Sequence, residues 1–151
     1  MKKIITVDGP AGSGKGKISK YISNKYKFFH IESGIFYRRL AYELQTNNIK
    51  VNDDKRIKKF LKTIKRISLR KITALRKESI GADAAELTNL KYVRDFVNKH
   101  QRLITKTYKK KEGFVIDGRD IGSVVFRKAY IKLYVDVDVN IRAKRRFKQL
   151  I

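Results

Sequence analysis

The sequence lacks cysteine entirely, and its 151 residues include only 14 acidic side chains. The absence of cysteine excludes a disulfide framework and a thiolate metal site. No apolar run approaches the roughly 18 residues that span a bilayer. The apolar run near the N-terminus is also shorter than the roughly 7–15 residues of a signal-peptide core. We therefore expect a cytoplasmic protein that makes no contact with a membrane.

The shortage of acids leaves a large excess of positive charge. The chain has 38 Lys and Arg against 14 Asp and Glu, a formal net charge of +24. Such a balance can indicate a nucleic-acid-binding protein. It can also reflect a drift in composition, since the cations are scattered over the whole length and Ile, Asn and Tyr are frequent. We favour drift, and expect a weak, salt-sensitive affinity for RNA or DNA in either case.

The apolar share of 42% is enough for one folded domain over 1–151. Strands are predicted at 3–7, 28–31, 113–117 and 130–136, with one or two more within 65–80. Helices are predicted after the loop at 8–17, at 35–44, from Asp53-Asp54 to Ile64, from Leu87 to Ile104, and from Asp138 to the end. This alternation predicts an α/β fold with a parallel sheet.

The helical patterns also predict which side chains are buried. Ile18, Tyr21, Ile22 and Tyr26 share one face of the first helix, and Ile141 and Phe147 point inward from the last. His30 and His100 lie on apolar faces, where we expect core histidines. Asp8 and Asp117 each follow a strand, and they could either order Mg²⁺-bound water or cap loops.

Residues 8–17, DGPAGSGKGK, lie between the first predicted strand and the first predicted helix. The spacing Gly9-x4-Gly14-Lys15 is typical of a phosphate-binding loop. In such a loop backbone N–H groups surround phosphate oxygens and the lysine reaches the outer phosphates. A plain glycine turn is the less favoured alternative. Ser or Thr usually follows the lysine, whereas Gly16 and Lys17 stand here, and a lysine cannot make the hydroxyl's short hydrogen bond.

Four segments resemble the bacterial cytidylate kinases, members of the nucleoside monophosphate kinase family. The segments are DGPAGSGKG at 8–16, ESGIFYRRLA at 32–41, DGRDIGSVVF at 117–126 and RAKRRFKQL at 142–150. The resemblance implies an α/β, P-loop NTPase-type parallel sheet with flanking helices. It implies the strand order 2-3-1-4, with the family's fifth strand apparently absent. It also implies a small inserted segment at about 45–98 that binds the acceptor nucleotide.

The resemblance further implies phosphoryl transfer from ATP to CMP or dCMP, with Mg²⁺ arriving on ATP and no direct protein ligand for the metal. Lys15 and Arg119 would be the catalytic residues. ATP would be held by Gly9, Pro10, Ala11, Gly12, Ser13, Gly14, Lys15, Gly16 and Lys17. CMP would be held by Ser33, Tyr37, Arg38, Arg94, Arg119 and Asp120. Arg94 and Asp120 would recognise the cytosine, and Arg38 and Arg119 the acceptor phosphate.

Several positions depart from the family pattern. Glu32 replaces an aspartate, Ser123 a threonine, and the stretch ADAA at 82–85 places Ala82 and Ala85 where an asparagine and a serine are usual. We also expect the chain to be shorter at its C-terminus than the family domain, without the arginine-rich lid. A nucleotide-binding protein without turnover is therefore the alternative to an active monomeric kinase. A basic nucleic-acid-binding protein is a more distant one.

Overall fold

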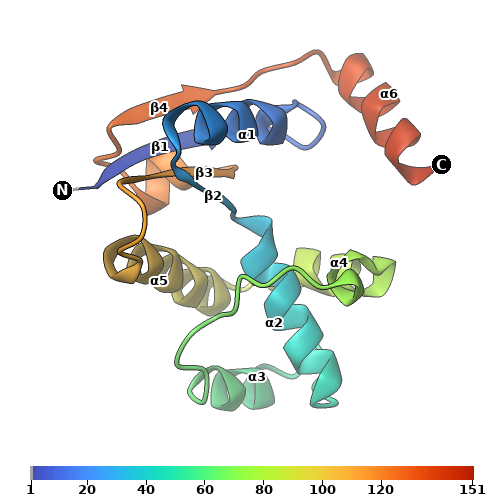
Figure 1. Cartoon of the computed structure of the whole chain (residues 1–151). Coiled ribbons are helices and arrows are strands. Elements are labelled where there is room, and N and C mark those ends of the chain that lie inside the picture. The colour runs from blue at the N-terminus through green and yellow to red at the C-terminus, as the bar shows by residue number, and fades with distance from the viewer. Residues whose placement is uncertain (1) are drawn as a thin grey trace. The chain divides into compact units, whose positions relative to one another are not determined.

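The computed structural model describes residues 2–151. Internal contacts divide the chain into two compact units. The first unit comprises Met1–Glu32 and Ile104–Ile151, and the second comprises Ser33–Leu103. Each unit is described by itself below, and the labels follow Figure 1.

The first unit is built on a parallel sheet of four strands (Figure 1). The strands are β1 (Lys3–Asp8), β2 (Phe29–Glu32), β3 (Gly113–Gly118) and β4 (Ile131–Tyr134), in the order β2-β3-β1-β4. All neighbouring pairs are parallel. The predicted fold class, α/β with a parallel sheet in the order 2-3-1-4, is therefore confirmed.

Acidic side chains gather where these parallel strands end. Asp8 is the last residue of β1, and its register partners are Gly118 on β3 and Tyr134 on β4. Glu32 ends β2 opposite Asp117. Since ligands of parallel α/β sheets bind at the carboxyl ends of the strands, this edge is the place to look for a site.

Helix α1 (Lys15–Tyr26) follows the predicted phosphate loop, but only Ile22 of the predicted apolar face packs against the core. Ile18, Tyr21 and Tyr26 are exposed, whereas Ser19 and Ser23 are buried. The Ser23 hydroxyl donates to the carbonyl oxygen of Phe28, 2.8 Å away. Small side chains let a helix approach its neighbours closely, so the serines face inward with Ile22, and the other large apolar residues of the helix face outward.

The C-terminal elements also differ from the predicted burial. Helix α6 (Val139–Leu150) is capped by Asp138, where the helix was predicted to begin. The Asp138 carboxylate accepts from the backbone N–H of Asn140 at 2.9 Å. However, Ile141 and Phe147 are 47% and 65% exposed, so they do not point inward. The four residues of β4, which is an edge strand, are exposed as well.

The second unit consists of helices: α2 (Gly34–Thr46), α3 (Asp54–Leu61), the 3₁₀ turn η1 (Thr73–Arg76), α4 (Glu78–Leu87) and most of α5 (Lys91–Thr107). Phe36, Leu40 and Leu44 of α2 are buried, since a spacing of four residues places them on one face of the predicted helix. Ile80 and Leu87 of α4 are buried too.

Two predictions in this unit are wrong. Residues 65–80 form no strand; an irregular stretch leads into η1 and then into α4. The long helix begins at Lys91, because the chain turns at 88–90, so Leu87 belongs to α4. Across the described residues, none of the helices has the length and apolar character that a membrane span requires.

Candidate functional site

The predicted phosphate loop joins β1 to α1 in the first unit. Gly12 and Gly14 have φ values of +76° and +89°, a region that favours glycine because it has no Cβ. A Cβ on Gly9 would lie 2.5 Å from the carbonyl oxygen of Val135, so that position also requires glycine. Helix α1 starts without a side-chain cap or an acidic residue in its first turn. Its positive end is therefore available to an anion.

Lys15, the first residue of α1, lies among charged side chains. Its ammonium donates to the carbonyl oxygen of Pro10 at 3.2 Å. Burial lowers the pKa of Lys15 below the usual value, and the positive charge of Arg119 adds to that effect. The carboxylates of Asp117, Asp8 and, more weakly, Glu32 oppose it. The fold thus brings two residues of the DGRD segment close to the lysine of the glycine loop.

Asp8 caps a loop. Its two carboxylate oxygens accept from the backbone N–H groups of Ile121 and Gly122, each at 2.8 Å, and its side chain is nearly buried. The N–H groups belong to the π-helical turn η2 (Ile121–Val125) that follows Arg119 and Asp120. Asp8 therefore ties the segment carrying two predicted acceptor-binding residues to the strand that carries the glycine loop.

His30 is not the apolar core residue that the sequence suggests. Its Nε2 lies 2.5 Å from Oδ2 of Asp117, across neighbouring strands β2 and β3. The imidazole therefore fixes one oxygen of a carboxylate that lies close to Lys15. His100 agrees with the prediction, since it is buried and its Nδ1 bonds to the carbonyl oxygen of Phe96 in the same helix.

The second unit positions the other predicted acceptor residues on α2 and α5. Ser33 precedes α2, and Tyr37 and Arg38 follow within its first two turns. The Arg38 guanidinium donates to the carbonyl oxygen of Leu75 at 2.8 Å. A Cβ on Gly81 would lie 3.2 Å from the same guanidinium. Thus η1 and α4 hold Arg38 in place.

Arg94 projects from the first turn of α5, and Nη1 donates to the carbonyl oxygen of Thr88 at 2.7 Å. It is therefore held against the turn between α4 and α5. Ala82 and Ala85, the two departures from the family pattern, lie on α4 with exposed side chains.

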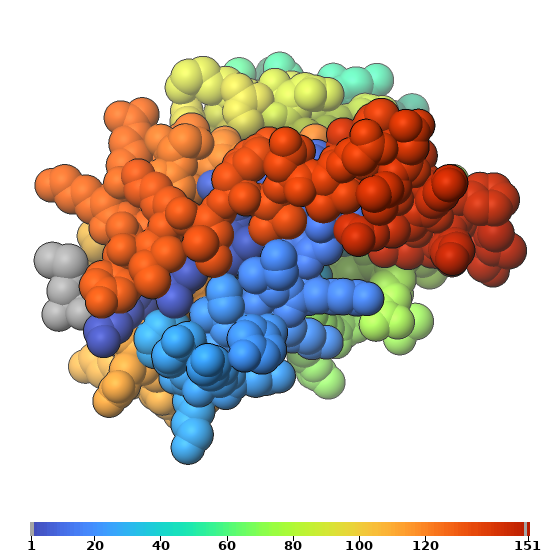
Figure 2. Space-filling model, turned by 90° about the horizontal axis from the view of Figure 1, so that it is seen from above, coloured from blue at the N-terminus to red at the C-terminus, as the bar shows by residue number. Residues whose placement is uncertain are grey.

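One residue at the glycine loop was missed by the predictions. Nη1 of Arg145, on α6, donates to the carbonyl oxygens of Gly12 and Ser13, both at 3.2 Å. The backbone of Arg142 lies so near that a Cβ on Gly12 would be 3.1 Å from its carbonyl oxygen. Figure 2 shows the red residues of α6 beside the blue residues of the N-terminal part. The sequence indicates a basic helix here, but it does not indicate that this helix contacts the glycine loop.

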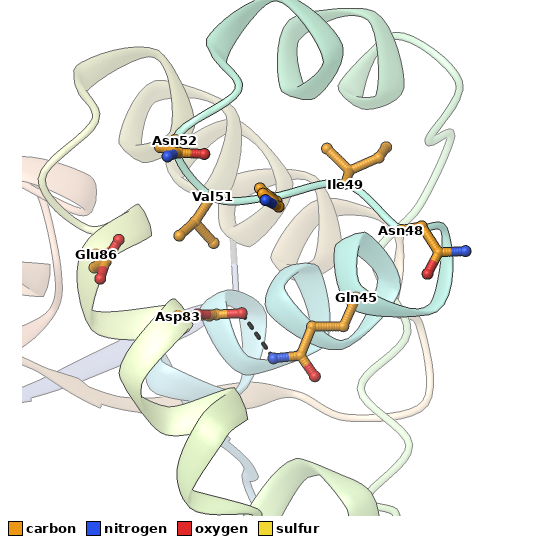
Figure 3. Close-up of a pocket in the computed structure, with 8 residues that line it drawn as sticks. Gln45, Asn48, Ile49, Val51, Asn52, Asp83 and Glu86 are labelled. Atoms are coloured by element: carbon orange, nitrogen blue, oxygen red, sulfur yellow. Dashed lines mark hydrogen bonds between the residues drawn. The ribbon is translucent and has the colours of Figure 1, made fainter.

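A separate pocket lies in the second unit (Figure 3). It is lined by the end of α2, the following loop and α4, and the Gln45 amide donates there to Asp83 at 2.7 Å. None of the predicted site residues lines this pocket, so it is distinct from the candidate site.

Comparisons with known proteins identify the family of the chain. The model of the "Cytidylate kinase" family matches residues 5–151. A cytidylate kinase from Fusobacterium nucleatum subsp. nucleatum is 35% identical over 98% of this chain and 70% of its own length. One from Coxiella burnetii is 36% identical over 97% of this chain and 67% of its own length.

A solved structure supports the fold as well. The crystal structure of TT1252 from Thermus thermophilus covers 98% of this chain and 72% of its own, with a TM-score of 0.52. At 16% identity this likeness concerns the fold alone. The family match extends over nearly the whole sequence, and two relatives above one-third identity agree with it. The chain therefore belongs to the cytidylate kinase family.

Proposed function

We propose that this protein transfers the γ-phosphoryl group of ATP to CMP or dCMP, giving CDP or dCDP and ADP. Family membership supports the reaction class. The proposal depends above all on one arrangement: Lys15 lies close to Asp117 and Arg119, beside a glycine loop and the start of α1. Phosphoryl transfer is mainly a matter of positioning and charge neutralisation, and this arrangement provides both.

The glycine loop is the proposed ATP site. Its backbone N–H groups and the positive end of α1 suit phosphate oxygens, and Lys15 supplies a cation for the outer phosphates. The hydroxyl of Ser13 is buried without a hydrogen-bond partner among the described residues, as expected of a loop that accepts a polar ligand. Lys17 is exposed in the first turn of α1, and supplies further charge.

Magnesium would arrive on ATP, where it neutralises phosphate charge. Among the carboxylates that raise the pKa of Lys15, Asp117 has the largest effect. We propose that Asp117 contacts the water shell of the metal.

The acceptor residues are proposed from the family motifs. Arg38 and Arg119 would bind the monophosphate, because a guanidinium can hold two phosphate oxygens at once. Ser33 and Tyr37 would assist there, and Arg94 and Asp120 would recognise the base. In the reaction, an oxygen of the acceptor phosphate forms a bond to the γ-phosphorus while the bond to the departing ADP oxygen breaks. Arg119 would stabilise the charge that develops.

The alternative is binding without turnover. It is favoured by Lys17 in place of a hydroxyl and by Ala82 and Ala85 in place of polar residues. A lysine can attract a phosphate but cannot make the hydroxyl's short hydrogen bond, and two alanines leave the base with fewer polar contacts.

The test is ADP formation by the purified chain in the presence of Mg-ATP, with and without CMP. We expect CMP-dependent ADP formation that is absent from Lys15→Ala. Saturable binding of CMP and ATP without ADP formation would favour the alternative. Failure of the folded chain to bind either nucleotide would overturn both. The same assay with dCMP and UMP shows how far the base is selected.

A further inference from the structure

A stretch of the second unit has only one sign of charge. Residues 55–77 contain eleven Lys and Arg and no Asp or Glu. The remaining 128 residues carry the other 27 cations and all 14 acids. We call this stretch the basic segment. Its cations are Lys55, Arg56, Lys58, Lys59, Lys62, Lys65, Arg66, Arg70, Lys71, Arg76 and Lys77. Lys and Arg make up 11 of its 23 residues but only 27 of the other 128, an enrichment that a uniform drift in composition does not produce.

The fold turns these cations outward. Ile57 and Leu61 anchor α3 with exposed fractions of 0% and 7%, and Ile67 and Leu75 anchor the run that follows. With the apolar positions turned inward, all eleven cationic side chains are exposed. The segment is therefore an ordered amphipathic surface with a cationic outer face.

Backbone contacts hold the less regular part of the segment in place. Arg39 of α2 is buried, and its guanidinium donates to the carbonyl oxygen of Arg70. Arg38 donates to that of Leu75. At the start, the Asp53 carboxylate caps α3 by accepting from the N–H of Arg56 at 3.1 Å. These contacts fix the path of the backbone from which the cations project.

We propose that the basic segment binds the phosphate backbone of nucleic acids, without regard to base sequence. Like charges close together repel, so the segment raises the free energy of the folded protein unless a polyanion neutralises it. A polynucleotide can engage many of these cations at once and gains free energy from released counterions. A single nucleotide cannot span a surface that begins on α3 and continues over more than ten further residues. This inference is independent of the proposed kinase activity.

The test compares two variants of the full chain with equal loss of charge. In the first, Lys55, Lys58, Lys59 and Lys62 are changed to Gln. In the second, the same change is made at Lys106, Lys109, Lys110 and Lys128, which are exposed residues of the first unit. Binding of a fluorescently labelled oligouridine is measured by anisotropy at several NaCl concentrations. Circular dichroism establishes that both variants are folded.

We expect the first variant to lose about tenfold in affinity or more at moderate salt. Its plot of log affinity against log salt should become shallower by about 0.7 for each lost phosphate contact to a single strand. The second variant should change by less than about threefold. Equal losses in both variants would overturn the proposal in favour of total charge. An unchanged affinity in the first variant would show that these lysines do not bind the oligonucleotide. Displacement of the oligonucleotide by micromolar CMP would overturn it in favour of a role at the nucleotide site.

Discussion

Lys15 is a residue whose charge costs stability until a ligand arrives. Burial lowers its pKa, so the folded protein favours the neutral amine more than the unfolded chain does. The charged lysine therefore lowers the free energy of unfolding at neutral pH. This loss of stability becomes smaller as the pH rises from the lowered pKa towards the ordinary value. Bound phosphates would raise the pKa of Lys15, because their negative charge favours the charged form of the amine.

We accordingly expect Lys15→Met to keep or slightly raise the melting temperature while removing ATP binding. The measurement is thermal unfolding by circular dichroism with and without Mg-ATP. The wild-type protein should show an ATP-dependent rise in Tm, as ligands that bind the native state do, and the variant should show none. A large drop in Tm without ligand would mean that the lysine stabilises the empty fold.

Arg119 serves the acceptor in the proposed function. Removing it should weaken CMP binding more than ATP binding, because Lys15 and the loop amides still hold the donor. Isothermal titration of Arg119→Ala with each nucleotide measures the two losses separately. Equal losses would contradict its assignment to the acceptor phosphate.

Arg145 is expected to shape the glycine loop from outside. Its two hydrogen bonds fix the carbonyl groups of Gly12 and Ser13, so we expect it to keep the loop in the conformation that binds ATP. Each such bond contributes on the order of 1 kcal/mol, so Arg145→Ala should weaken ATP binding by about tenfold and leave CMP binding nearly unchanged.

Arg146→Ala is the matched control for that variant. It removes the same charge from the next position of α6, and in the described structure Arg146 forms no hydrogen bond with the loop. A similar loss of ATP affinity in both variants would show that charge alone is responsible. Partial recovery in Arg145→Lys would support the contact, since a lysine can still donate to one carbonyl.

Among the elements, β1 and η2 are joined by the carboxylate of Asp8. Both Asp8 oxygens accept backbone N–H groups, and an asparagine would present an NH₂ group where one acceptor is needed. Asp8→Asn should therefore lower the free energy of unfolding by about 1–3 kcal/mol. The measurement is urea unfolding followed by circular dichroism. The exposed Asp136→Asn, with the same change of charge, should be nearly neutral, and equal losses would contradict the capping role.

The strands could be predicted because their apolar runs are short, continuous and followed by turns. The runs at 3–7, 28–31 and 113–117 match β1, β2 and β3 closely. The place of the glycine loop was predicted from its spacing together with the strand before it and the helix after it. Strands were wrongly predicted within 65–80 because apolar and polar residues alternate along part of RISLRKI, as they do in a half-buried strand. That segment is held by the guanidinium groups of Arg38 and Arg39, a tertiary contact that no local pattern shows.

Burial proved harder to predict than secondary structure. The spacing of Ile18, Tyr21 and Tyr26 correctly predicts a helix, but periodicity shows only that residues share a face and not which face is covered. The serines of α1 are buried with Ile22 against the core, so Ile18, Tyr21 and Tyr26 are exposed. The pairing of His30 with Asp117 escaped prediction for a related reason, since the residues are 87 positions apart.

For the whole molecule, charge is the main unusual property. A net charge of +24 on 151 residues implies self-repulsion that salt should screen. We expect Tm to rise by a few degrees as NaCl increases from about 0.01 M to about 0.15 M, over which the screening length falls from about 30 Å to about 8 Å. Melting curves at fixed pH measure this. A constant or falling Tm would show that favourable ion pairs outweigh the repulsion.

The positions of the two histidines make the protein convenient for spectroscopy. His30 bonds to a carboxylate close to Lys15, whereas His100 bonds within its own helix. In a proton NMR spectrum the two imidazoles would give two resolvable C2–H signals without isotope labelling. The His30 signal should move when nucleotide reaches the loop, and the His100 signal would serve as an internal reference in the same sample.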